Sequence, residues 1–259
     1  MRGGLLLLLV LTLALGTFHP VSAADFDLTV GFQTFNYKEN LESPKKSEER
    51  GVLSGIGLSK MLLETDVAVL RLAANLTIGQ TLYDGAIRDS RSGEITPYQD
   101  RTDHVIVDIA SLFHAGFVYG GVGYHRWERQ LASYIENYSW GYVPLGLRFS
   151  FDPNLDCSFA VDVGAEFMFS GTIEIPPGGA FITHGQAPLG NRTGWHIKGD
   201  LIYEPSESMS IQISPWYRYF AIGQSEPFSL TTFESKKMTV YEPDSATHQF
   251  GVSISVPIR

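Results

Sequence analysis

The residues best placed for acid–base chemistry gather in one short stretch, QDRTDH, which contains Asp100, Asp103 and His104. A carboxylate that orients a histidine can turn the imidazole into a general base that activates water. Asp84 precedes this stretch across the same predicted loop, and His184 lies in a later loop. Aspartate and histidine side by side at the start of a strand are also common as plain loop ends. We favour that second interpretation and assign no catalytic residue here.

Acyl transfer is the second chemistry to consider. A lipid deacylase needs a serine and a histidine on its lipid-facing surface, with an acid to orient the histidine. His125 and Ser139 lie on neighbouring predicted strands, but the sequence does not determine which side of the sheet each of them faces. We expect both to be ordinary polar positions of a sheet.

Metal and cofactor sites are not indicated. The seven histidines form neither an HxH nor an HExxH pattern, and no phosphate-binding glycine loop is present. Cys157 is the only cysteine, so no intrachain disulfide framework is expected. The formal net charge of -9 makes nucleic acid an unsuitable partner. We therefore predict no metal, no cofactor and no nucleic acid.

The elements that hold these residues are predicted by the stretch CSFAVDVGAEFMFS, which runs from Cys157 to Ser170. Apolar side chains alternate strictly with small or polar ones, and this period of two is typical of a β-strand with one apolar face. The same alternation recurs along the chain and predicts ten strands. Their ranges are 25–37, 51–62, 66–83, 102–113, 116–129, 134–151, 157–170, 194–203, 209–222 and 248–258.

The connections between these strands alternate in length. Short polar turns such as DPNLD (152–156) and EPSES (204–208) contain the usual turn-forming residues. Most intervening connections are long and polar, near 38–50, 84–101, 171–193 and 224–247. With an even number of strands, both termini lie at the short-turn end.

Three features indicate that the apolar face meets lipid rather than a protein core. The apolar positions from Phe159 to Phe169 span about 25 Å when tilted, which is the height of the apolar band on a transmembrane barrel. Aromatic residues end the apolar faces, as in the interfacial girdles of such barrels. The predicted interface aromatics are Trp195, Tyr203, Tyr217 and Tyr219.

The third feature is ionisable groups on the opposite face at mid-strand. Four cations and four acids are predicted to form an ion-pair network inside the lumen, because a low-dielectric interior requires buried charges to be paired. The predicted network contains Arg71, Asp108, Arg148, Asp162, Glu166, Lys198, Asp200 and Arg218.

The first residues predict export. Met1-Arg2, the apolar run from Leu5 to Leu15 and the small-residue exit Val21-Ser22-Ala23 are typical of a secretory signal peptide. We predict a signal peptide over residues 1–23 and a single β-barrel domain over residues 24–259.

With its signal peptide, alternating strands, loop rhythm and last strand HQFGVSISVPI, the sequence resembles the bacterial outer-membrane β-barrel proteins. The resemblance implies one antiparallel up-and-down transmembrane barrel, of ten strands (eight or twelve being the alternatives), with short periplasmic turns and long extracellular loops. It also implies the outer membrane of a Gram-negative bacterium, contact with outer-membrane lipid and assembly by the barrel assembly machinery. The chain departs from the pattern by ending Pro257-Ile258-Arg259, without a terminal aromatic residue.

The expected function is non-enzymatic. Because ten strands enclose little space, we predict a narrow or closed pore, or a structural or surface-binding protein whose extracellular ligand the sequence does not name. Two alternatives stay open: an outer-membrane hydrolase similar to the omptin proteases or the lipid A deacylases, and a soluble periplasmic ligand-binding barrel.

Overall fold

A computed structural model describes residues 26–41, 47–65, 67–88, 95–153, 156–206 and 209–258. The signal peptide predicted for residues 1–23 lies outside these ranges and stays a prediction. The described residues form β-strands joined by turns and loops, and among them no helix is long and apolar enough to cross a membrane.

Ten long antiparallel strands form the wall of a barrel. They are β1 (Phe26–Glu39), β2 (Ser47–Glu64), β3 (Ala68–Arg88), β4 (Ile95–Ala115), β5 (Val118–Gln130), β6 (Ile135–Phe151), β7 (Cys157–Ile175), β9 (Thr193–Ser206), β10 (Met209–Ile222) and β13 (Ser245–Ile258). Three short strands lie beyond one end of the wall: β8 (Gly185–Pro188), β11 (Phe228–Thr231) and β12 (Lys237–Val240).

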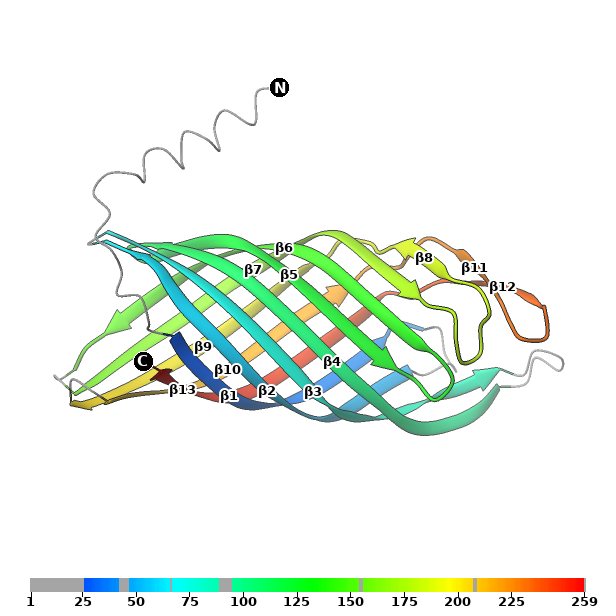
Figure 1. Cartoon of the computed structure of the whole chain (residues 1–259), viewed down its shortest axis with the longest axis horizontal. Helices are drawn as coiled ribbons and strands as arrows, with labels where there is room; N and C mark the ends of the chain where they lie inside the picture. The colour runs from blue at the N-terminus through cyan, green and yellow to red at the C-terminus, as the bar shows by residue number, and fades with distance from the viewer. Residues whose placement is uncertain are drawn as a thin grey trace, which may run out of the picture.

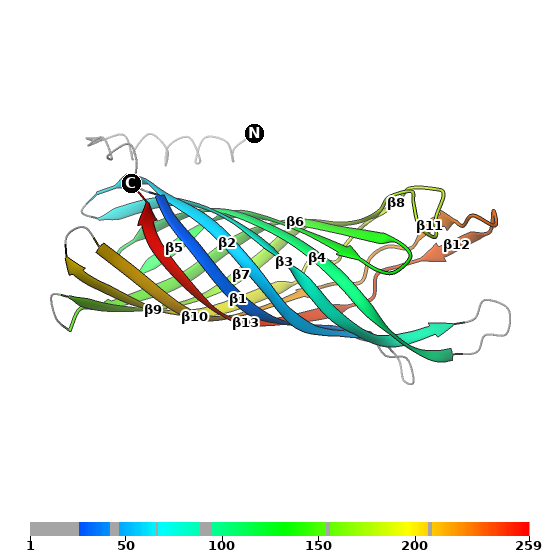
Figure 2. The ribbon, with the colours of Figure 1, turned by 60° about the horizontal axis from the view of Figure 1, so that its bottom comes forward.

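The sheet closes on itself (Figures 1 and 2). Each strand pairs with its neighbour in the chain, except that β7 pairs with β9 and β10 with β13 across the insertions. β1 pairs with β13 along its whole length, from Phe26 opposite Ile258 to Glu39 opposite Ser245. Closure leaves the ten-stranded wall without a free edge, which a hydrocarbon environment requires. The predicted ten-strand up-and-down barrel is confirmed.

The strand connections differ in length at the two ends of the barrel. β4 and β5 are joined by Gly116 and Phe117 alone, and Gly116 has a φ of 59°, a left-handed conformation that glycine adopts without a steric cost. The described ends of the chain lie at this short-turn end, whereas β8, β11 and β12 lie at the opposite, long-loop end (Figure 1).

The side chains of β7 face as the alternation predicts. Phe159, Val163 and Phe167 point outward and are 44–45 % exposed, whereas Asp162 and Glu166 point inward and are 9 % and 8 % exposed. The same pattern holds on β13, where Phe250, Val252 and Ile254 are outward and Gln249 is buried. The apolar surface of the barrel is therefore its outside, and its polar surface is the lumen.

Two predicted boundaries differ from the structure. β3 and β4 continue through much of the predicted loop 84–101, to Arg88 and from Ile95. Beyond the apolar band both faces of a strand meet water, so the alternation disappears although backbone pairing continues. Part of the predicted loop 224–247 is also ordered as strands, because β11 and β12 pair as a separate two-stranded sheet.

Candidate functional site

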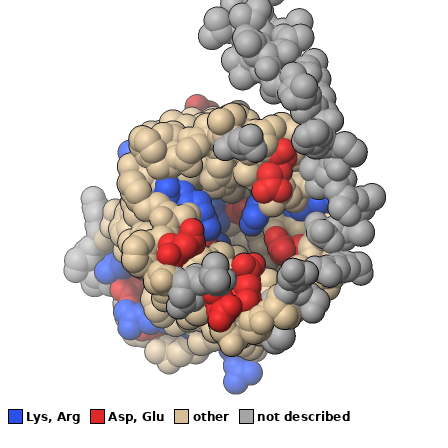
Figure 3. All heavy atoms as spheres, turned by 90° about the vertical axis from the view of Figure 1, so that its left-hand side faces the viewer, with Lys and Arg blue, Asp and Glu red and all other residues tan. Residues whose placement is uncertain are grey.

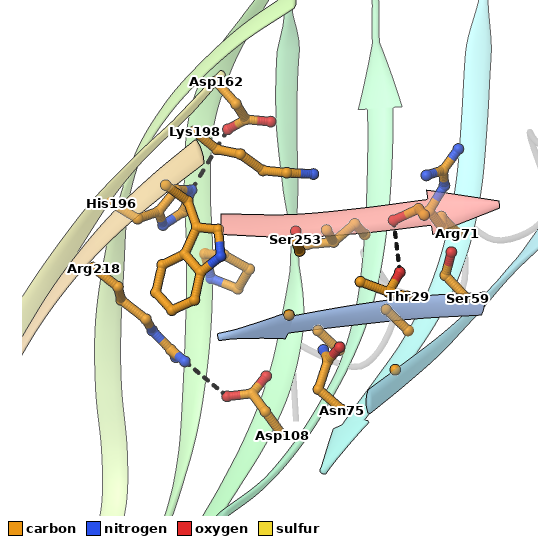
Figure 4. A pocket seen from close by; sticks show the side chains of 18 of the residues that line it. Thr29, Ser59, Arg71, Asn75, Asp108, Asp162, His196, Lys198, Arg218 and Ser253 are labelled. Carbon is orange, nitrogen blue, oxygen red and sulfur yellow. Dashed lines mark hydrogen bonds and ion pairs between the residues drawn. The ribbon is translucent and has the colours of Figure 1, made fainter. Parts of the chain in front are cut away.

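The interior of the barrel is divided into an open half and a filled half. A cavity of about 650 Å³, here called the lumen cavity, occupies the half nearer the short turns. Viewed from that end, the surface is hollowed and charged side chains of both signs lie inside the opening (Figure 3). Figure 4 shows residues from strands far apart in the sequence converging on this space, among them Thr29, Asn75, Asp108, Arg218 and Ser253.

Arg218 anchors the inner end of the cavity. Its Nη2 donates to Glu166 Oε2 at 2.6 Å, and its Nη1 donates to Asp108 Oδ2 at 3.0 Å. Asp108 also receives the Tyr142 hydroxyl at 2.6 Å and faces His125 Nδ1 at 2.8 Å. One guanidinium thus connects carboxylates from β4 and β7 across the lumen.

A second group of ion pairs lies nearer the opening. Arg148 Nη2 is 2.8 Å from Asp200 Oδ2, and its Nη1 is 3.4 Å from Asp162 Oδ2. Lys198 Nζ is 3.0 Å from Asp200 Oδ1. Arg71 is held most loosely, with Nη1 3.9 Å from Asp27 Oδ2 and both side chains well exposed.

The structure therefore places all eight residues of the predicted lumen network on the inner face, and seven of them line the cavity; Asp200 is buried behind Arg148 and Lys198. The sequence reasoning missed His196, which lies between Asp162 and Glu166 at 3.5 and 3.1 Å. It also missed Tyr119, whose hydroxyl is 2.7 Å from His196 Nε2. His196 has the inward parity of Lys198 on β9, and that parity was the signal available.

Glycines make room for these inward side chains. Gly146 and Gly164 lie against the phenol ring of Tyr119, where an added Cβ would overlap the hydroxyl. Only glycine at both positions lets the ring cross toward His196.

The half of the lumen nearer the long loops is filled by side chains that we call the aromatic plug. Phe35, Trp127 and Tyr138 are fully buried, and Trp127 stacks on Tyr138 with ring centroids 4.7 Å apart. The buried cluster comprises Phe35, Tyr37, Leu53, Ile106, Trp127, Tyr138, Trp140, Tyr142, Ile173, Ala187, Leu189, Phe220 and Ile222. The sequence signal was aromatic residues on the inward parity of β1, β5 and β6, which the sequence analysis did not use.

Four carboxylates from distant segments surround Arg129 beside the plug: Glu39, Glu49, Glu136 and Glu242. We call them the carboxylate cluster. Arg129 Nε donates to Glu49 Oε1 at 2.7 Å and Nη1 to Glu136 Oε2 at 2.8 Å, whereas Glu39 Oε1 is 3.6 Å from Nη1. Glu242 Oε1 instead accepts the Tyr37 hydroxyl at 2.8 Å.

His104 completes this group without adding charge. Trp127 Nε1 donates to His104 Nδ1 at 2.9 Å, so the ring proton is on Nε2, 3.0 Å from Glu49 Oε2. One guanidinium therefore faces four acids.

The carboxylate cluster lies beyond the apolar band, at the level where the outward neighbours on β1 and β2 are Lys38, Glu48 and Arg50. Although burial opposes ionisation, Arg129 and His104 together lower the pKa of Glu49 to about 2. Burial and the neighbouring Glu136 and Glu39 raise the pKa of Glu242 well above its usual value. Burial also raises the pKa of Glu39.

The predicted interface aromatics lie on the outer surface. Trp195 is 46 % exposed and packs against Tyr217, with ring centroids 4.8 Å apart, and against Tyr219 at 6.3 Å. Tyr203, 47 % exposed, lies at the other end of β9. The set thus marks both edges of the apolar surface; its contact with lipid headgroups stays a prediction.

The residue sets considered for hydrolysis are not brought together. Asp103 is exposed on the outer face of β4, whereas His104 is buried in the lumen. His184 instead pairs with Glu174 at 3.0 Å, and the Asp100 carboxylate accepts the Tyr98 hydroxyl at 2.5 Å. His125 is buried inside and stacks on Trp140, whereas Ser139 bonds to Thr172 on the other face of the wall. Among the described residues, no group of three or more His, Cys, Asp and Glu side chains could hold a metal ion.

No protein-family model matches the sequence, and no curated protein matches it either. Solved structures do resemble its fold. The outer membrane protease OmpT from Escherichia coli aligns with a TM-score of 0.52 over 93 % of this chain and 97 % of that one, at 8 % sequence identity. The outer membrane protein OprG from Pseudomonas aeruginosa (TM-score 0.38, 12 % identity, 90 % and 96 % coverage) also aligns, as does Neisserial surface protein A (0.37, 10 %, 89 % and 96 %). At such identities the OmpT likeness establishes the fold alone: this chain is similar to outer-membrane β-barrels.

Proposed function

We propose that the chain is a non-catalytic outer-membrane β-barrel of a Gram-negative bacterium that does not conduct solutes, and whose lumen opens only toward the periplasm. The short turns would face the periplasm and the long loops the cell exterior. In this orientation the lumen cavity is a blind chamber entered from inside the cell envelope. The aromatic plug closes the other side.

The filling of the long-loop half of the lumen is the observation that carries this proposal. Six aromatic side chains from four strands are at most 4 % exposed there: Phe35, Tyr37, Trp127, Tyr138, Trp140 and Phe220. Their rings pack edge to face and stacked at centroid distances of 4.7–5.6 Å. Rings in such close contact fill this part of the lumen, which supports a barrel closed to hydrated solutes.

The outer surface supports a membrane location over the soluble alternative. Large apolar residues are exposed around the wall, for example Phe32 on β1 at 68 %, Ile78 on β3 at 52 % and Leu145 on β6 at 50 %. A water-soluble barrel would leave this continuous apolar surface unsatisfied, whereas acyl chains cover it. Outer-membrane lipid and the barrel assembly machinery are the partners this proposal entails.

Planar-bilayer recording tests the proposal. The purified chain is expected to give no stable conductance steps above the lipid baseline. A variant with the plug reduced, Trp127→Ala together with Trp140→Ala, is expected to open detectable steps if it folds. Stable, large, porin-like conductance from the unmodified chain would refute the proposal.

A further inference from the structure

A second, smaller cavity lies among the long loops, outside the lumen cavity. Its volume is about 190 Å³, and it is enclosed by β6, β7, the segment after β7 and the β11–β12 hairpin, at the end of the molecule labelled β11 and β12 in Figure 1. We call it the loop cavity. Its walls are largely apolar and include Ile173, Ile175, Phe181, Phe228, Leu230 and Val240. Tyr241, also on its lining, is 49 % exposed, so this wall of the cavity is also part of the protein surface.

Two acids of the carboxylate cluster line this apolar space. Glu136 is 6 % exposed and Glu242 is 4 % exposed, yet both border the loop cavity. The Arg129 and Tyr138 donors contact Oε2 of Glu136, and the Tyr37 donor contacts Oε1 of Glu242. Two nearly buried carboxyl groups thus stand at one side of a cavity whose other walls are hydrocarbon.

The charges around the loop cavity do not balance. Arg129 is the one cation that contacts the carboxylate cluster among the described residues, and its short bonds go to Glu49 and Glu136. Around the lumen cavity, by contrast, four cations (Arg71, Arg148, Lys198 and Arg218) meet five acids (Asp27, Asp108, Asp162, Glu166 and Asp200), and each acid lies within 4 Å of at least one of these cations. Burial and the neighbouring acids raise the pKa of Glu242, so its carboxyl stays protonated in the absence of a bound cation. A cation of suitable shape beside it offsets the cost of ionising that buried carboxyl.

The walls indicate which cation fits. A hydrated metal ion needs several oxygen ligands, and the described residues offer no group of three acidic or histidine side chains for it. Aliphatic and aromatic walls instead suit an organic cation, whose hydrocarbon part gains by burial and whose charge is attracted to aromatic faces.

We propose that the loop cavity binds a compact organic ammonium ion from outside the cell, with its nitrogen at Glu242 and Glu136 and its hydrocarbon part against Phe181, Phe228 and Leu230. The arrangement selects for positive charge and small size together. The proposed binding from outside the cell rests on the proposed orientation of the long loops, but not on whether the lumen conducts.

Isothermal titration calorimetry on the full chain folded in detergent micelles tests this proposal, with benzylamine as the probe and heats corrected with empty micelles. Benzyl alcohol is the matched neutral probe. Benzylamine is expected to bind at least about tenfold more tightly than benzyl alcohol, the factor that a hydrogen bond to a charged group supplies. Equal affinity of the two probes, or no benzylamine heat above the micelle blank, would overturn the proposal. This test needs only the unmodified chain.

Two variants locate the site. Glu242→Gln keeps the size of the side chain and is expected to lower the affinity for benzylamine about tenfold. Glu234→Gln is its control, because Glu234 lies in the same hairpin, is 68 % exposed and pairs with Lys236 at 2.7 Å; its affinity is expected to stay unchanged. Folding of each is checked by the mobility difference between unheated and boiled samples. A folded Glu242→Gln chain that binds like Glu234→Gln would contradict the site.

Discussion

In the short-turn half of the lumen, four cations meet five acids around an open cavity, whereas in the long-loop half four acids share one guanidinium beside packed aromatic rings. Charges in the first half keep access to water. Those in the second half are buried among packed side chains, where losing one hydrogen-bond or ion-pair partner costs more stability. The two halves of one barrel therefore differ in how much stability a single side chain controls.

The largest effect is expected from Arg129, which is 2 % exposed. Arg129→Met leaves Glu49 and Glu136 buried without their cation, and removing one partner of such a pair typically costs about 3–5 kcal/mol. The free energy of unfolding, measured by urea titration in detergent, should fall by that amount. Arg50→Met is the control, because Arg50 is 74 % exposed on the outer face. Equal unfolding midpoints for the two variants would show that the carboxylate cluster does not stabilise the barrel.

A smaller loss is expected in the lumen cavity. Arg218→Met removes the donor to Glu166 and Asp108, but water in the cavity can solvate the freed carboxylates in part. We expect a loss of about 1–3 kcal/mol in the same urea titration. A loss as large as that of Arg129→Met would erase the distinction between the two halves.

The smallest effect is a change of pH dependence. Glu242 has a raised pKa in the folded chain, so its contribution is fully present below the unfolded pKa and is lost as pH rises toward the folded value. Glu49 acts in the opposite direction, because its folded pKa is about 2 and its contribution is lost as pH falls below its usual 4.5. Over the single pH unit from 5 to 6 the Glu242 contribution should fall by at most about 1.4 kcal/mol.

Glu242→Gln removes that loss. The urea midpoints at pH 5 and pH 6 should therefore lie closer together in the variant than in the unmodified chain. Parallel pH profiles for the two chains would mean that Glu242 is ionised in the folded barrel.

The barrel wall was predictable from the sequence because its signal is local. Alternation within β7 fixes which side chains face lipid, and the same parity places Arg148 and Arg218 in the lumen. Which side chains pair inside the lumen could not be predicted in the same way. His196 meets Glu166 only because β9 pairs with β7 in a particular register.

The carboxylate cluster shows most clearly what the sequence alone does not predict. Glu39, Glu49, Glu136 and Glu242 belong to four segments separated by loops, and each resembles an ordinary polar residue at a strand end. Their proximity depends on barrel closure between β1 and β13 and on the aromatic plug beneath them. The extra length of β4 was missed for a related reason, because the stretch from Ile95 to Arg101 lies beyond the apolar band and lacks alternation.

Tryptophan quenching tests the central claim, a lumen open at one half and dry at the other, most directly. The four tryptophans sample three surroundings: Trp216 lines the lumen cavity, Trp127 and Trp140 lie in the plug, and Trp195 lies on the outer surface. Single-tryptophan chains made by Trp→Phe substitution can be folded into vesicles and titrated with acrylamide or with brominated lipid. The account predicts that acrylamide quenches Trp216 several-fold more than Trp127, and that brominated lipid quenches Trp195 most. Acrylamide quenching of Trp127 equal to that of Trp216 would contradict it.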